Sequence, residues 1–143
     1  MQENKLIDSN IIVYAFDKSE KDKHENARVL LYSCLDKKER FFISFQNISE
    51  FYSAVTTKIE KPLQLEEARR ICKLIIEFAG FIKIAPSTNA MINAMELNEK
   101  SKIPYWDALI VSTMLENNVL TIYTENVKHF ERVPALKVIN PFK

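Results

Sequence analysis

Three acidic residues and one polar triplet, far apart in the sequence, carry side chains suited to binding a cation. Asp8 follows the apolar run "KLI", Glu50 lies in "SFQNISEFY", Asp107 lies in "PYWDALIVSTML", and Thr124, Glu125 and Asn126 follow "LTIY". Each residue alone has an ordinary explanation as a helix cap, a solvated helix residue, a partner of the helix dipole or a turn residue. What they do together depends on whether the fold brings them to one place.

Short apolar runs alternate with longer helical patterns along the chain. The candidate strands, nearly continuous in hydrophobicity as expected when both faces of a sheet are covered, are 5–7, 41–43, 81–84, 120–123 and 136–139. Apolar residues recur with the period of a helix in 27–35, 48–55, 68–76, 90–95 and 108–115. This alternation predicts βαβ units and a parallel sheet with helices on both faces. We expect one domain over residues 1–143.

The limits of the helices are marked by particular residues. Ser44 and Ser87 are suitable N-terminal caps, and Pro104 stands where a new helix would open. Gly80 is the only glycine and is placed to end the third helix. Because phosphate-cradling loops and dinucleotide fingerprints need several glycines, the sequence excludes both.

The predicted topology gathers the polar residues at one edge of the sheet. Parallel sheets bind ligands beyond the carboxyl ends of their strands, which is where Asp8 and Thr124 would lie. A helix that feeds a parallel strand runs against it, so Asp107, in the first turn of such a helix, belongs to the same edge. Glu50 lies about a turn and a half into the helix that follows the second strand. The four segments are therefore expected to converge.

Several carboxylates within a few ångströms repel one another and raise one another's pKa. A divalent cation usually resolves such repulsion, and oxygen ligands without histidine or cysteine suit Mg²⁺ or Mn²⁺. A cation of this kind polarises a phosphate and activates a water molecule. The residues thus favour hydrolysis of a phosphate ester or phosphodiester.

Composition adds few constraints on the partner. The chain has 143 residues, 47% of them hydrophobic, and a net charge of +1, which neither requires nor excludes nucleic acid. No apolar run is long enough to span a bilayer, and the start lacks the pattern of a signal peptide, so we expect a cytoplasmic protein without membrane contact. Cys34 and Cys72 lie on apolar helix faces and are expected to be reduced core thiols.

The sequence resembles the PIN-domain ribonucleases, and more narrowly the VapC-type toxins of toxin–antitoxin pairs. Four segments carry the resemblance: "LIDSNIIVYAFD", "KHENARVLL", "ISFQNISEFY" and "IPYWDALIVSTMLENNVLTIYTENVKHF". Asp8, Glu50 and Asp107 stand at the first three acidic positions of the family, and Asn10 follows two residues after the first. The resemblance extends from Leu6 to about residue 130.

The resemblance implies a three-layer α/β/α sandwich with a central five-stranded parallel sheet and an acidic pocket that binds Mg²⁺ or Mn²⁺. It implies endonucleolytic cleavage of single-stranded RNA, a homodimer, and an antitoxin protein that covers the site. Asp8 and Asp107 would bind the metal directly, and Glu50 would do so through water or orient the attacking water. Asn10 and Thr124 would hold the carboxylates by hydrogen bonds.

The fourth acidic position departs from the family pattern, because Asn126 stands where many relatives carry aspartate. A neutral amide oxygen would be a weak or water-mediated ligand, and Glu125 would substitute only if its side chain turned inward. Of the remaining polar residues, His129 is expected in a loop.

Two other functions stay open at this point. A non-catalytic PIN-fold module could hold RNA or protein with a weakened metal site, and Asn126 is its main support. A housekeeping RNA-processing nuclease would use the same residues as a toxin. Haloacid-dehalogenase-like phosphotransfer is disfavoured because it needs an aspartate where Asn10 stands.

Overall fold

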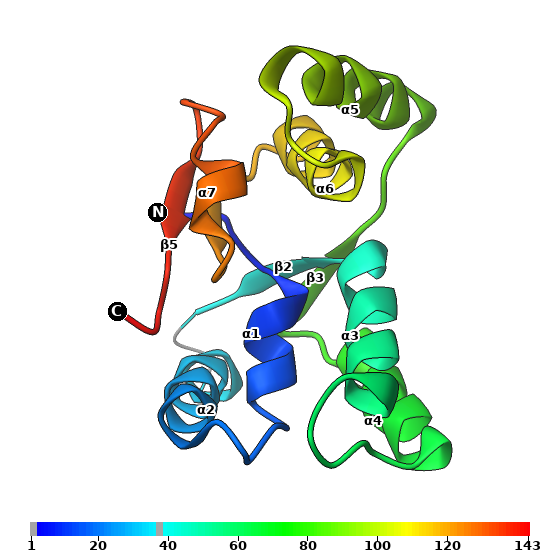
Figure 1. The fold of residues 1–143 in the computed structure, drawn as a ribbon, viewed down its shortest axis with the longest axis vertical. Coiled ribbons are helices and arrows are strands. Elements are labelled where there is room, and N and C mark those ends of the chain that lie inside the picture. Colours follow the sequence, from blue (N-terminus) through cyan, green and yellow to red (C-terminus); the bar gives the residue numbers. More distant parts are fainter. Residues whose placement is uncertain (1–2, 37–38) are drawn as a thin grey trace.

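The computed structural model describes residues 3–36 and 39–143 (Figure 1). Within these ranges, all strand pairings are parallel and the strand order is β3-β2-β1-β4-β5. The strands are β1 (Lys5–Ile7), β2 (Phe41–Ser44), β3 (Phe81–Ile84), β4 (Thr121–Tyr123) and β5 (Lys137–Ile139). The predicted five-stranded parallel sheet is confirmed, and the predicted strand ends differ from the observed ones by at most one residue.

Helices cover both faces of the sheet. They are α1 (Ser9–Tyr14), α2 (Lys21–Leu35), α3 (Phe45–Thr57), α4 (Leu65–Glu77), α5 (Thr88–Ser101), α6 (Tyr105–Glu116) and α7 (Val127–Phe130). Figure 1 shows α1 to α4 gathered on one side and α5 and α6 on the other, which confirms the three-layer sandwich. The sequence pattern did not predict α1 and α7, because six and four residues are too few to display a helical period.

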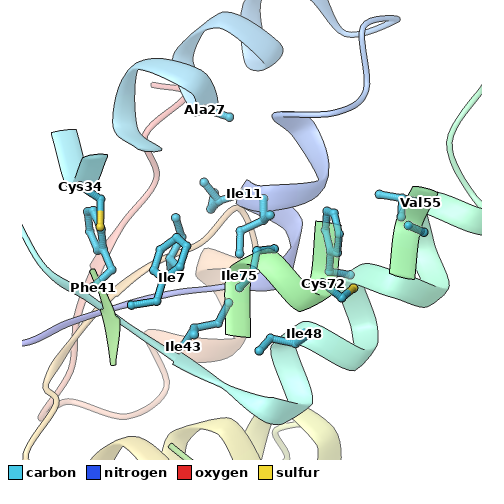
Figure 2. Packing of buried hydrophobic residues seen from close by; sticks show 14 of the residues in the cluster. Ile7, Ile11, Ala27, Cys34, Phe41, Ile43, Ile48, Val55, Cys72 and Ile75 are labelled. Carbon is cyan, nitrogen blue, oxygen red and sulfur yellow. The ribbon is translucent and has the colours of Figure 1, made fainter. Parts of the chain in front are cut away.

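The strands feed two separate cores because their side chains alternate between the two faces. In β1, Ile7 packs with residues of α1 to α4, whereas Leu6 packs with residues of α5 to α7. Figure 2 shows the first of these cores, in which Ile7, Phe41 and Ile43 of the sheet meet Ile11 and Ile48 of the helices. Both cores consist of buried apolar side chains, which pack the helices against the sheet.

The predicted helix starts agree with the structure. The Ser44 hydroxyl accepts a hydrogen bond from the Gln46 amide, and a capping box fixes the start of α3. Ser87 caps α5 in the same way, and Pro104 directly precedes α6. The expectation that Gly80 ends the helix is wrong, because α4 ends at Glu77 with Phe78 as its C-cap, and Gly80 does not adopt a positive φ. A Cβ atom at Gly80 would lie only 2.4 Å from the ring of Phe78.

The predicted core positions agree less uniformly. Cys34 and Cys72 are buried and free, as expected. The apolar stripe predicted over 90–95 is wrong in part, because α5 buries its alanines and leaves Met91 and Met95 exposed. Within the described residues, no helix has both the length and the apolar character required to cross a membrane.

The strand order creates a crevice at the centre of the sheet. From β1 the chain proceeds to β2 and β3 on one side, and it later returns to β4 and β5 on the other side. The neighbouring strands β1 and β4 therefore form the switch point at which parallel sheets bind ligands beyond the strands' carboxyl ends. Asp8 and Thr124 directly follow these two strands.

Candidate active site

Asp8 is the most firmly held side chain of the site. It is 3% exposed, and its Oδ1 accepts hydrogen bonds from the Ser9 amide at 2.8 Å and from Asn47 Nδ2 at 3.2 Å. Its Oδ2 accepts from Thr124 Oγ1 at 2.7 Å and from Asn10 Nδ2 at 3.4 Å. Asp8 is thus both the N-terminal cap of α1 and the innermost acid of the pocket.

The electrostatics of Asp8 oppose its ionised form. The pKa of Asp8 is raised from 3.8 to about 6: burial raises it most, the bonds from Thr124 and Ser9 lower it, and the charges of Glu50 and Asp107 also raise it. Because these carboxylates act on one another, the site favours a positive charge between them.

Glu50 reaches the same pocket from α3. Its two oxygens accept hydrogen bonds from Ser9 Oγ and Gln46 Nε2, each at 3.2 Å. Burial raises its pKa, these donors lower it, and Asp107 raises it. Gln46 Nε2 also donates to the Trp106 carbonyl oxygen at 2.8 Å, which ties the start of α3 to the start of α6.

Asp107 stands in the first turn of α6, as predicted, and it has a partner that the sequence did not predict. His129 Nδ1 lies 2.5 Å from Asp107 Oδ2. The expectation that His129 is a loop residue is wrong, because it lies in the short helix α7, from which its ring contacts Asp107 of the pocket.

The predicted acids meet at one pocket of about 390 Å³. Its lining includes Asp8, Asn10, Glu50, Asp107 and Asn126 from the prediction, together with Ser9, Val13, Tyr14, Asp17, Ala54, Lys58 and Ile59. The four segments therefore converge as the topology predicted, and Asn126 occupies the fourth corner.

The donor set fits a hard divalent cation, since it consists of carboxylate, amide and hydroxyl oxygens. Across residues 3–36 and 39–143, no three His, Cys, Asp or Glu side chains already stand close enough to hold one ion. To hold one ion jointly, Asp8, Glu50 and Asp107 would therefore have to move closer together or reach it through water, with the amide oxygen of Asn126 as a further ligand.

In the turn after β4, Thr124 points towards Asp8, whereas Glu125 points away from it. Thr124 Oγ1 donates to Asp8 and accepts from the Asn126 amide at 3.0 Å. Glu125 does not turn inward to replace the missing acid, because Lys23 Nζ at 2.6 Å and the Tyr14 hydroxyl at 2.8 Å hold it outside. Its amide donates to Asn10 Oδ1, so its contribution among the predicted supporting residues is through the backbone.

The sequence did not predict the pocket-lining Tyr14 and Lys58, nor the contacts that Ser9, Gln46, Asn47 and His129 make with the acids. One signal was present for Asn47, which stands three residues after the cap Ser44, at the position where a capping box places a polar side chain. Its amide then donates to Asp8 from a fully buried position. Gln46 also carried a signal, because it stands four residues before Glu50 on one helix. Ser9 and His129 carry none, because their contacts with Glu50 and Asp107 join segments distant in sequence.

The structure is thus an α/β domain whose parallel sheet has an acidic pocket at its switch point. The family described as PIN domain matches residues 5–136, and the chain belongs to this family. A comparison with curated proteins gave no match.

Solved structures share the fold over nearly the whole chain. VapC20 of Mycobacterium tuberculosis, a sarcin–ricin loop cleaving toxin, aligns with a TM-score of 0.71 at 12% identity, over 91% of this chain and 95% of that one. A toxin–antitoxin complex from Klebsiella pneumoniae gives 0.67 at 20% identity, over 96% and 98%. VapBC2 from Rickettsia felis, bound to a DNA fragment from their promoter, gives 0.64 at 26% identity, over 95% and 97%. The predicted resemblance to PIN domains and VapC-type toxins is confirmed.

Proposed function

We propose that this protein is a metal-dependent endoribonuclease that hydrolyses phosphodiester bonds in single-stranded RNA, and that it is the toxin of a toxin–antitoxin pair. The observation that carries the proposal is the meeting of Asp8, Glu50 and Asp107 at one pocket of the sheet's switch point. The names of the similar solved structures, which include a cleaving toxin and toxin–antitoxin complexes, support the same reading.

Each acid has a distinct role in this proposal. Asp8 and Asp107 would hold Mg²⁺ or Mn²⁺, with Asn126 as a weak or water-mediated ligand. The ion would supply charge stabilisation at the phosphate and acidify a water molecule. Glu50 would bind the ion through water, or would orient the attacking water and accept its proton, a role that its raised pKa favours. Asn10 and Thr124 keep the Asp8 carboxylate in place.

The proposed partners follow from the same comparison. An antitoxin protein would cover the pocket, the toxin would act in the cytoplasm, and two copies of this chain would form a homodimer. A housekeeping nuclease would use the same residues without an antitoxin, so co-purification with the product of a neighbouring small gene separates the two readings.

The test is cleavage of single-stranded RNA by the purified chain with and without Mn²⁺. We expect chelation to stop cleavage and Asp8→Asn to reduce it roughly a thousandfold, because the ion supplies several kcal/mol of transition-state stabilisation. Circular dichroism checks that the variant remains folded. Equal cleavage by both proteins would overturn the proposal.

A second candidate function is an RNA- or protein-binding module without catalysis. The neutral Asn126 and the outward-facing Glu125 favour it, because no carboxylate then joins Asp8, Glu50 and Asp107 at the position where Asn126 stands. Calorimetric titration with Mn²⁺, in the presence of RNA, discriminates the two, since the binding module predicts no measurable uptake of metal.

A further inference from the structure

The contact between His129 and Asp107 joins two elements at the rim of the pocket. His129 Nδ1 in α7 lies 2.5 Å from Asp107 Oδ2 in α6, and the two residues are 22 positions apart. An ionised carboxylate only accepts hydrogen bonds, so Nδ1 carries the proton in this contact. The imidazole is therefore a donor to one of the proposed metal ligands.

Asp107 depends on this donor more than the other acids depend on any one of theirs. Asp8 accepts from four donors, and Glu50 has one donor on each oxygen. Among the described residues, His129 is the only hydrogen-bond partner of the Asp107 side chain. Without it, nothing in that part of the chain fixes which way the Asp107 carboxylate points.

We propose that His129 is a positioning residue of the metal site, which rests on the function proposed above. Its N–H occupies Oδ2 and fixes the carboxylate plane, and this leaves Oδ1 of Asp107 for the cation. Hydrogen bonds to metal-binding carboxylates act in this way, and their loss commonly weakens metal affinity by about 10- to 100-fold.

A purely structural role for His129, as a link between α7 and α6, is the rival explanation. The neighbouring Phe130 argues against it, because its ring is fully buried in the core formed with α5 and α6. α7 is thus anchored by apolar packing, and the half-exposed imidazole is not needed to hold it. Variants at position 129 are therefore expected to fold.

The experiment is calorimetric titration of the full chain with Mn²⁺ alone, together with thermal unfolding in a chelator. We expect His129→Ala to weaken Mn²⁺ binding at least about tenfold with little change in the midpoint of unfolding. His129→Asn should restore most of the affinity, because its amide nitrogen stands the same number of bonds from Cα as Nδ1 does. Lys128→Ala, on the neighbouring exposed residue, serves as the matched control and should bind as the wild type does.

Two outcomes would overturn the inference alone. In the first, Asp107→Asn abolishes Mn²⁺ binding while His129→Ala binds as tightly as the wild type. In the second, His129→Asn is as weak as His129→Ala, which would mean that the donor is not what matters. Absence of Mn²⁺ binding by the wild type would overturn the proposed function as well, so the two failures are distinguishable.

Discussion

Asp8 and Asp107 line the same pocket but are held in opposite ways. Asp8 is almost fully buried and accepts hydrogen bonds from a backbone amide and three side chains. Asp107 stands at the rim with a 16% exposed side chain, and His129 is its partner on the described chain. One acid is thus fixed by the folding of the sheet, and the other by a single contact from the shortest helix.

The two acids of this site therefore differ in how much desolvation their placement requires. Fixing Asp8 requires a charge in the core, which burial disfavours and four donors only partly offset. Fixing Asp107 requires little desolvation but leaves its position dependent on one side chain. Substitutions at the contacts of Asp8 should therefore change the free energy of unfolding most, whereas Asp107 should be the acid that moves most when a ligand binds.

The largest expected effect is a pH dependence of stability that comes from Asp8. Its pKa in the folded protein, about 6, lies above the ordinary value of 3.8, so folding favours its protonated form. The resulting stabilisation is fully present below pH 3.8 and is lost as the pH rises through about 6. Metal-free protein should lose roughly 3 kcal/mol of unfolding free energy in this way.

Urea unfolding of the wild type and of Asp8→Asn in a chelator, across this pH range, measures the effect. The difference between the two profiles isolates Asp8 from the other carboxylates. If the unfolding free energies of the two proteins changed with pH in parallel, burial of the Asp8 carboxyl would not be the source of the pH dependence.

Thr124→Val should have the next largest effect. It removes the 2.7 Å hydrogen bond to Asp8 and the acceptor for the Asn126 amide in a fully buried position. We expect a loss of about 1–3 kcal/mol in unfolding free energy near neutral pH. Thr57→Val, at an exposed position of α3, is the matched control and should change little. A similar loss in both variants would contradict the view that the hydrogen bond from Thr124 to Asp8 contributes specially to stability.

Ser9→Ala should be milder, because Glu50 keeps its second donor, Gln46. A loss of about 1 kcal/mol is expected for a half-buried hydrogen bond, measured by denaturant unfolding. The same variant should raise the pKa of Glu50 further, since the Ser9 hydroxyl lowers it. A loss as large as that of Thr124→Val would show that Glu50 is held as firmly as Asp8, and not to a degree between Asp8 and Asp107.

Lys23→Ala tests the outermost contact and should have the smallest effect. Its ion pair with Glu125 is about one-third exposed on both sides, so its loss should cost less than about 1 kcal/mol and depend on salt. Unfolding at low and high ionic strength measures this. A larger, salt-independent loss would show that this contact supports the site.

The sequence predicted the sheet well because buried parallel strands are nearly continuous in hydrophobicity, so a short run of residues is enough to identify each one. It also placed Asp8 and Asp107 correctly, since each stands next to the end of an element whose direction the βαβ rule fixes. Glu50 was placed by its helix alone, and its two donors were not foreseen.

The rest of the site was beyond sequence reasoning because it depends on pairs that only tertiary structure brings together. His129 and Asp107 meet through a four-residue helix that no periodic pattern marks. The outward direction of Glu125 depends on Lys23 and Tyr14, two residues more than a hundred positions away. Met91 and Met95 were misplaced because each directly follows an alanine, and only Ala90 and Ala94 lie on the buried face of α5.

Asn47 has a consequence for how this chain can vary. Its carbonyl oxygen accepts from the Ser44 amide at the start of α3, and its amide nitrogen donates to Asp8. Aspartate would keep the first bond and set a second charge against Asp8, alanine would lose both bonds, and glutamine would overfill a fully buried position. A saturation library should therefore tolerate almost no replacement at this position, although Asn47 touches the proposed chemistry only through another residue.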